Sequence, residues 1–222
     1  MSTTNTTGGA DSATHAPEIP GSGILEDLPV FPLSTVLFPG GLLPLRIFEQ
    51  RYMDMAKACL RDATPFGVCL IRSGREVGAP AEPESLGCTA RITDWDMQQL
   101  GLLQVKTLGG QRFRILASRI NPAGLRVARV ELLAEAADAV LPTEFMACAR
   151  LLRAVLDEHG EALVHPPLRF ESSAWVGARL SEILPVPPAA KQRLLELDDP
   201  LQRIEILHKF LVQHGLAQAG QG

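Results

Sequence analysis

Proline residues interrupt the hydrophobic runs in the first quarter of the chain. Residues 28–52 hold short apolar stretches separated by Pro29, Pro32, Pro39 and Pro44. Proline cannot donate a main-chain hydrogen bond to a neighbouring strand, and it holds the preceding residue in an extended conformation. Closely spaced prolines among β-forming residues therefore predict short, bent strands at sheet edges and exclude a flat central strand.

A helix and two strands are predicted after this segment. Apolar residues recur every three or four positions over residues 49–61, which is typical of an amphipathic helix packed on a sheet. Residues 66–72 are almost wholly apolar and residues 86–93 have β-like composition, so both predict strands. The intervening residues 73–85 are rich in Gly, Pro and Glu and predict a loop.

The residues around Gly109-Gly110 indicate a β-hairpin. The segments on either side favour strands, and two glycines can supply the positive φ angles of a two-residue turn. Arg112 and Arg114 would then project together from the second strand onto a solvated face. Residues 125–133 predict a further strand.

The chain becomes helical after about residue 135, where Ala, Leu and charged residues replace the β-branched ones. Apolar spacing and boundary residues predict four helices. They are residues 143–158, 173–184, 188–195, and a last helix that Asp199 caps and Pro200 begins.

Size and charge narrow the class of protein. The 222 residues are 46% hydrophobic, which is enough for one large or two small cores. Because 21 basic residues face 25 acidic ones, we expect no nucleic acid partner. Residues 1–23 predict a disordered tail and residues 217–222 a flexible one. No secretory leader and no stretch of about 20 apolar residues occurs, so we expect no membrane contact and a cytoplasmic location.

The sequence lacks the motifs of the common catalytic and metal-binding sites. It contains no C-x-x-C pair, no Gly-Lys dipeptide for a phosphate-binding loop, and no G-x-S-x-G or H-E-x-x-H motif. We therefore expect no metal, no cofactor and four buried, reduced cysteines. A novel site remains open if folding gathers several chemically active residues, namely Glu49, Cys59, Cys69, Asp94, Asp96, His159 and His165.

Three segments together resemble the Lon protease N-terminal domain family. They are the proline-rich segment running into Ile47-Phe48-Glu49-x-Arg51-Tyr52, the Gly-x-x-Arg-Phe-x-Ile motif of residues 109–115, and the pattern from Pro187 to Arg203. Gln50 departs from the family, since stand-alone members often carry proline there. This resemblance implies an α+β fold over residues 24–216. Its parts would be a six-stranded, β-rich PUA-like pseudo-barrel with one packed helix at residues 24–136, followed by a C-terminal four-helix bundle at residues 137–216.

The resemblance also implies a non-catalytic module that binds unfolded or apolar polypeptide segments. In this family the contacting surface is attributed to the β-rich part near its helix start, which here is Glu49, Gln50, Arg51 and Tyr52. We add Trp95, because a large aromatic in a polar turn between strands can contact a partner, although its ring could fold back over the sheet edge. A protease or chaperone is the expected recipient if the chain acts as an adaptor.

Two other functions stay open. Some eukaryotic proteins with a Lon-like domain are ligand-binding or ubiquitin-ligase components, so the second hypothesis is a small-molecule-binding or novel enzymatic module. A closed, polar pocket would favour that hypothesis, whereas an open apolar groove would favour peptide binding. The third is an oligomeric scaffold, and the sequence leaves the oligomeric state undetermined.

Overall fold

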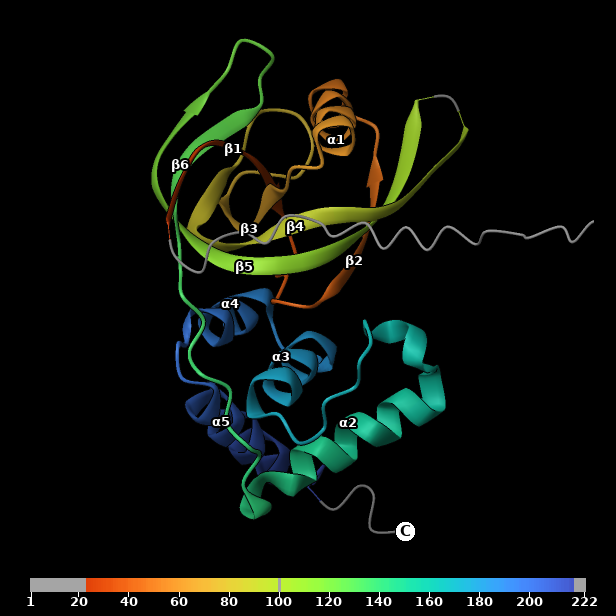
Figure 1. Cartoon of the computed structure of the whole chain (residues 1–222), viewed down its shortest axis with the longest axis vertical. Coiled ribbons are helices and arrows are strands. Elements are labelled where there is room, and N and C mark those ends of the chain that lie inside the picture. Colours follow the sequence, from red (N-terminus) through yellow and green to blue (C-terminus); the bar gives the residue numbers. More distant parts are fainter. Residues whose placement is uncertain (1–22, 100, 218–222) are drawn as a thin grey trace, which may run out of the picture.

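The computed structural model describes residues 23–99 and 101–217, which form six strands and five α-helices. The expected tails lie almost wholly outside these residues. In chain order the elements are β1 (Gly23–Leu33), β2 (Leu42–Ile47), α1 (Gln50–Asp62), β3 (Phe66–Ser73), β4 (Glu82–Gln99), β5 (Leu102–Ile120), β6 (Arg126–Leu132), α2 (Met146–His159), α3 (Ser173–Ile183), α4 (Pro188–Glu196) and α5 (Pro200–Gln213). The strands and α1 form one half and helices α2–α5 pack together as the other, which confirms the expected fold class (Figure 1).

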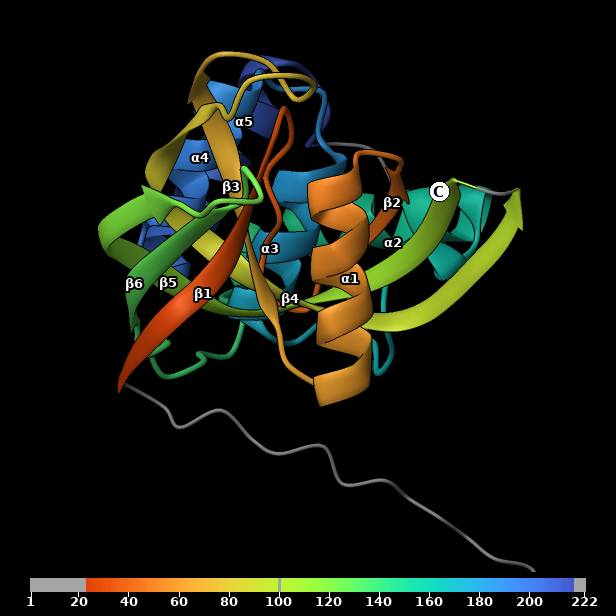
Figure 2. The same cartoon turned by 90° about the horizontal axis from the view of Figure 1, so that it is seen from above.

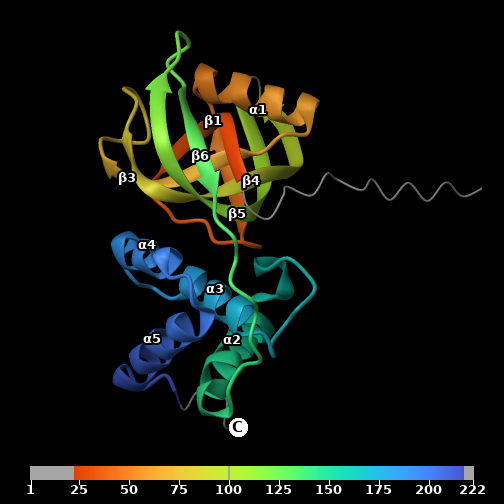
Figure 3. The same cartoon turned by 60° about the vertical axis from the view of Figure 1, so that its left-hand side comes forward.

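Five of the strands close into a ring, and β2 is added to its side. The strands are hydrogen-bonded in the order β2-β5-β4-β3-β1-β6, and β5 also pairs with β6. β4 pairs along one edge of β5, so β2 and β6 must share the other edge, one on each half of β5. β2 has no second strand partner among the described residues. Helix α1 lies over the end of the ring opposite the other helices (Figures 2 and 3).

β1 is longer and more central than its prolines predicted. It runs for 11 residues and pairs with β6 up to Val30 and with β3 from Val30 onward. Pro29 lies in the part paired only with β6, and Pro32 in the part paired only with β3. A register shift around Asp27, which has a φ of 55°, interrupts the pairing. Each proline therefore stands where β1 has a single neighbour, which is the condition under which a missing donor is tolerated.

The predicted hairpin turn at Gly109-Gly110 is wrong, because β5 runs through both glycines as one strand of 19 residues. Neither glycine has a positive φ. A Cβ atom on Gly109 would lie 2.2 Å from the carbonyl oxygen of Phe38, and one on Gly110 would lie 2.5 Å from Thr89 Oγ1. Close approach of neighbouring chain segments, not turn geometry, excludes side chains here. The chain instead reverses next to Gly101, whose φ is 85°.

β4 extends beyond the predicted strand at both ends. Its first residue, Glu82, pairs with Ser73 of β3, so part of the predicted loop is strand. At the other end Trp95 pairs with Val105 of β5, so Trp95 lies in a strand and not in a turn. The two strands continue together past the ring as an arm that projects beside α1 (Figure 1).

Arg112 is buried, which corrects the expectation of a solvated arginine face. Its guanidinium is fully enclosed and donates hydrogen bonds to the carbonyl oxygens of Leu195 and Leu197, each at 3.1 Å. It also pairs with the carboxylates of Glu135 at 3.1 Å and Asp198 at 3.0 Å. The last carbonyl groups of a helix have no hydrogen-bond donor within that helix. Arg112 supplies such donors to the end of α4 across the seam, which is the boundary between the β-rich half and the helical half.

The predicted helices are confirmed. Helix α2 is preceded by a single 3-10 turn at Thr143–Phe145, and Asp199 caps α5 by accepting a hydrogen bond from the Leu201 amide at 2.8 Å. Apolar residues of the loop after β1, of β3 and of β4 join the helical core, among them Phe38 and Leu70. The two halves therefore share buried surface.

Candidate functional site

An open groove lies between β2 and the end of β1. It has a volume of about 300 Å³. Most of the side chains that line it are apolar, and they are Phe31, Leu33, Leu43, Pro44, Leu45, Ile47, Phe48, Tyr52 and Val77; the polar members are Thr35, Arg46, Glu49 and Glu76. We call these 13 residues the β2 groove. Phe48 and Val77 are 57% and 55% exposed, so large apolar side chains stand in water at this site.

The start of α1 holds the loop that carries Val77. The carboxylate of Glu49 pairs with Arg51 at 2.8 Å and accepts a hydrogen bond from the Gly78 amide at 3.4 Å. Arg51 in turn donates to the carbonyl oxygens of Gly78 at 2.8 Å and Gly124 at 3.2 Å. Of this pair only Glu49 lines the groove, while Arg51 fixes the position of the neighbouring loop.

Tyr52 forms part of the wall of the groove. It is 5% exposed and its ring stacks on Phe31, with 3.9 Å between ring centroids. Burial raises the pKa of its hydroxyl, so the side chain stays neutral at physiological pH. Gln50 is exposed, donates to Asp54 at 2.7 Å and does not line the groove. The structure thus places two of the four residues expected at the helix start, Glu49 and Tyr52, in the groove.

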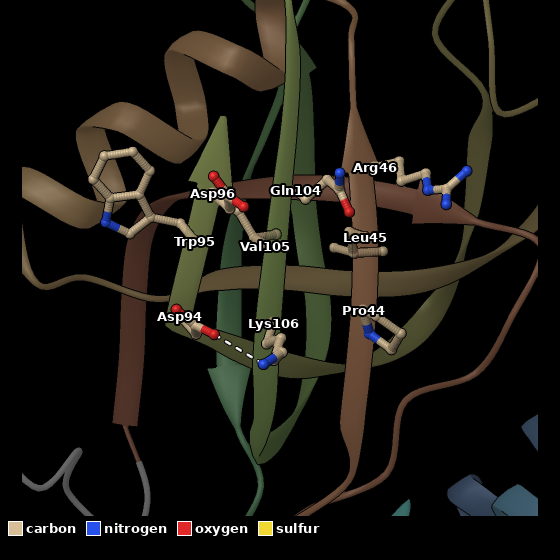
Figure 4. Close-up of a pocket in the computed structure, with 9 residues that line it drawn as sticks. All are labelled: Pro44, Leu45, Arg46, Asp94, Trp95, Asp96, Gln104, Val105 and Lys106. Carbon is tan, nitrogen blue, oxygen red and sulfur yellow. Dashed lines mark ion pairs between the residues drawn. The ribbon is translucent and has the colours of Figure 1, made fainter. Parts of the chain in front are cut away.

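Trp95 belongs to a different surface. It is 57% exposed and borders an open hollow of about 500 Å³ on the outer side of β2, β5 and β4. Polar residues line much of this hollow, including Lys106 and Asp94, which pair at 2.9 Å. Figure 4 shows the Trp95 ring pointing away from the other labelled side chains. The structure therefore does not bring Trp95 into one pocket with the start of α1.

The chemically active residues lie on several different elements, from Glu49 at the start of α1 to His159 at the end of α2. Among the described residues, no three His, Cys, Asp or Glu side chains could hold a metal ion. The four cysteines are buried and unpaired, as predicted, and burial raises the pKa of each thiol. A thiol with a raised pKa is a poor nucleophile at neutral pH. No helix in the part of the chain that the structure describes is long and apolar enough to cross a membrane.

Sequence reasoning missed Phe48 and Val77. One signal was available for Phe48, because Ile47-Phe48 places two apolar residues in succession at the end of an alternating strand, where both cannot face the core. Nothing in the sequence singled out Val77, which lies in a loop rich in Gly and Pro.

Comparison with known proteins agrees with this architecture. The sequence profile of the ATP-dependent protease La (LON) substrate-binding domain matches residues 27–213. The crystal structure of a Lon N-terminal domain protein from Xanthomonas campestris is 35% identical and superimposes with a TM-score of 0.70, covering 84% of this chain and 99% of that one. Protein cereblon of Danio rerio is 32% identical over 115 residues, which are 50% of this chain and 26% of cereblon. Lon protease of Paraburkholderia phytofirmans is 27% identical over 180 residues, which are 78% of this chain and 22% of that protease.

The chain thus spans about a quarter of the length of these two curated relatives. The family profile, in contrast, matches well over half of this chain, from the middle of β1 to the last residue of α5. The chain therefore belongs to the family of Lon protease substrate-binding domains.

Proposed function

We propose that this chain binds exposed apolar segments of other polypeptides in the β2 groove, without hydrolysing ATP or cleaving the bound segment. The observation that carries the proposal is the exposure of Phe48 and Val77 beside an apolar wall that includes Phe31 and Tyr52. Large apolar side chains left in water at a hollowed surface are characteristic of sites that bind apolar partners. The name of the family, a substrate-binding domain, supports the same class of ligand.

The proposed interaction is weak and reversible. Full burial of one apolar side chain contributes about 1.5–3 kcal/mol, and the loss of motional freedom on association offsets several such contributions. A groove of about 300 Å³ accepts only a few side chains. We therefore expect dissociation constants on the order of micromolar to hundreds of micromolar. Such affinities suit a module that samples unfolded chains and hands them to a separate protease or chaperone.

The shape of the groove supports a peptide over a small polar ligand. The groove is open, and its two acidic side chains, Glu49 and Glu76, are already engaged by Arg51 and by the Ser34 amide. An enclosed pocket with convergent, unengaged polar groups would be the expected form of a small-molecule site.

Peptide binding can be measured by fluorescence anisotropy with labelled apolar segments of a model unfolded protein. Phe48→Ser and Val77→Ser should each weaken binding about tenfold, which corresponds to about 1.4 kcal/mol of lost apolar contact. Val212→Ser is the matched control, because Val212 is 56% exposed on α5 and does not line the groove. Equal affinities of all three variants and the original protein, or no binding by the folded protein, would refute the proposal.

A further inference from the structure

The main chain of β2 turns half of its hydrogen-bonding groups toward its free side. The Gly109 amide of β5 donates to the carbonyl oxygen of Gly41 at 2.8 Å, and the register continues with Leu43 opposite Thr107 and Leu45 opposite Val105. Along an antiparallel strand the direction of these groups alternates from residue to residue. The amides and carbonyls of the odd-numbered residues therefore face β5.

The even-numbered residues Leu42, Pro44 and Arg46 accordingly direct their main-chain groups away from β5. That side has no strand partner within the described residues. Proline is tolerated in the middle of β2 for this reason, because the donor it lacks would have pointed to the open side. Three carbonyl acceptors and two amide donors, those of Leu42 and Arg46, therefore line a free edge beside the groove.

A strand laid along this edge would direct every second side chain inward. The inward side chains would meet the apolar members of the groove, such as Phe31, Ile47 and Tyr52, and the others would face water. Arg46 adds a charge preference: it is exposed and forms no ion pair within the described residues. Figure 4 shows its side chain reaching past β2 on the side away from β5. An acidic side chain on the added strand would complement this cation.

We propose that the ligand is an extended peptide that adds as a strand to the free edge of β2, with apolar residues at alternate positions and an acidic residue beside Arg46. This inference rests on the proposed peptide-binding function and specifies its ligand. Hydrogen bonds to the main chain are independent of sequence, so they explain how one site can accept many segments. The apolar groove then requires only that alternate residues be hydrophobic.

Methylation of the main-chain amides of the peptide distinguishes strand addition from binding through peptide side chains alone. The probe is a labelled peptide of about eight residues that alternates leucine with threonine and carries one aspartate. Two versions are N-methylated, one at every leucine and the other at every threonine. Strand addition predicts that one version loses about tenfold or more in affinity, since its methyl groups replace the donors that face β2, while the other stays within about threefold of the parent.

The outcomes distinguish the inference from the function on which it rests. If the parent and both methylated peptides bind alike, strand addition is wrong and binding through side chains in the groove stands. If the parent does not bind at all, both the strand mode and the proposed function fail.

The Pro44→Val variant provides a second test from the side of the protein. It adds an amide donor to the free edge, and we expect the folded variant to bind the parent peptide about three- to tenfold more tightly. Arg46→Gln should weaken binding of the aspartate peptide but not of its asparagine counterpart. An unchanged or reduced affinity of folded Pro44→Val would overturn strand addition. A doubled mass of the original protein in solution, together with absence of peptide binding, would also overturn it, because a second copy would then occupy the edge.

Discussion

Replacement of Arg112 by methionine tests how the two halves of the protein are joined. The Arg112 guanidinium crosses from β5 to the end of α4, where it donates to the carbonyl oxygens of Leu195 and Leu197. Methionine has a similar volume and is flexible, so Arg112→Met removes the donors without opening a large cavity. The substitution therefore isolates the polar contribution of this contact.

The size of the stability loss in Arg112→Met depends on which groups lose their hydrogen-bond donor. The carbonyl oxygen of Leu197 still accepts a hydrogen bond from Arg203 at 2.7 Å. Within the described residues, the carbonyl oxygen of Leu195 accepts from no donor other than Arg112. One unsatisfied buried carbonyl costs about 1–3 kcal/mol. The carboxylates of Glu135 and Asp198 are 45% and 82% exposed, so water can replace Arg112 around them at little cost. We therefore expect a loss of about 2 kcal/mol in the free energy of unfolding.

Urea titration followed by circular dichroism measures this loss, and a thermal scan should show a decrease in melting temperature of about 4–8 °C. Arg114→Met is the matched control, because Arg114 lies two residues further along β5 and its side chain is 52% exposed. The control should stay within about 0.5 kcal/mol of the original protein. Equal effects of the two substitutions would refute the conclusion that Arg112 is a buried donor at the seam.

Three further substitutions test individual features of the fold. Burial raises the pKa of Glu182 to about 7, an effect that Arg179 partly offsets, so the folded protein retains a proton that the unfolded chain loses above about pH 4.5. The free energy of unfolding should therefore fall by up to about 3 kcal/mol as the pH rises from 4.5 to 7. Urea titrations across this range should show a weaker dependence of stability on pH for Glu182→Gln, and an identical dependence would contradict the burial of Glu182. Gly109→Ala places a Cβ atom against the carbonyl oxygen of Phe38 and should lower stability by about 2 kcal/mol or more in the same assay, whereas a neutral effect would show that β5 can move away from Phe38. Asp199→Ala removes the cap of α5 and should lower the free energy of unfolding by about 1 kcal/mol, measured as a decrease in melting temperature; an unchanged melting temperature would contradict a stabilising role of the cap.

The sequence predicted elements whose signals are local. Asp199 and Pro200 marked the start of α5, because capping and the fixed φ of proline depend only on adjacent residues. The same holds for the amphipathic helix α1. The family resemblance supplied the closed ring, which no periodicity in a single strand could have indicated. The assignment of a domain boundary near residue 136 and the cytoplasmic location remain predictions.

The sequence predictions were wrong where the environment of a residue is set by a distant part of the chain. The Gly109-Gly110 pair is typical of a turn. In the structure no side chain fits at Gly109 because the main chain of Phe38, from another segment, lies against it. The sequence around Arg112 is typical of a surface strand. Arg112 is buried because the last carbonyl groups of α4, more than 80 positions later, lie against it. The candidate site was located only in part, since Glu49 and Tyr52 line the groove while Phe48 and Val77 were missed.

Binding of an extended apolar peptide at the β2 groove is the central claim, and nuclear magnetic resonance titration of the isotope-labelled protein with the leucine–threonine peptide tests it most directly. We predict that the largest amide shifts occur on β2, at Phe48 and at Val77, with saturation in the range from micromolar to hundreds of micromolar. Shifts confined to the helical half, for example around Ile206 and Phe210 on α5, would contradict the account.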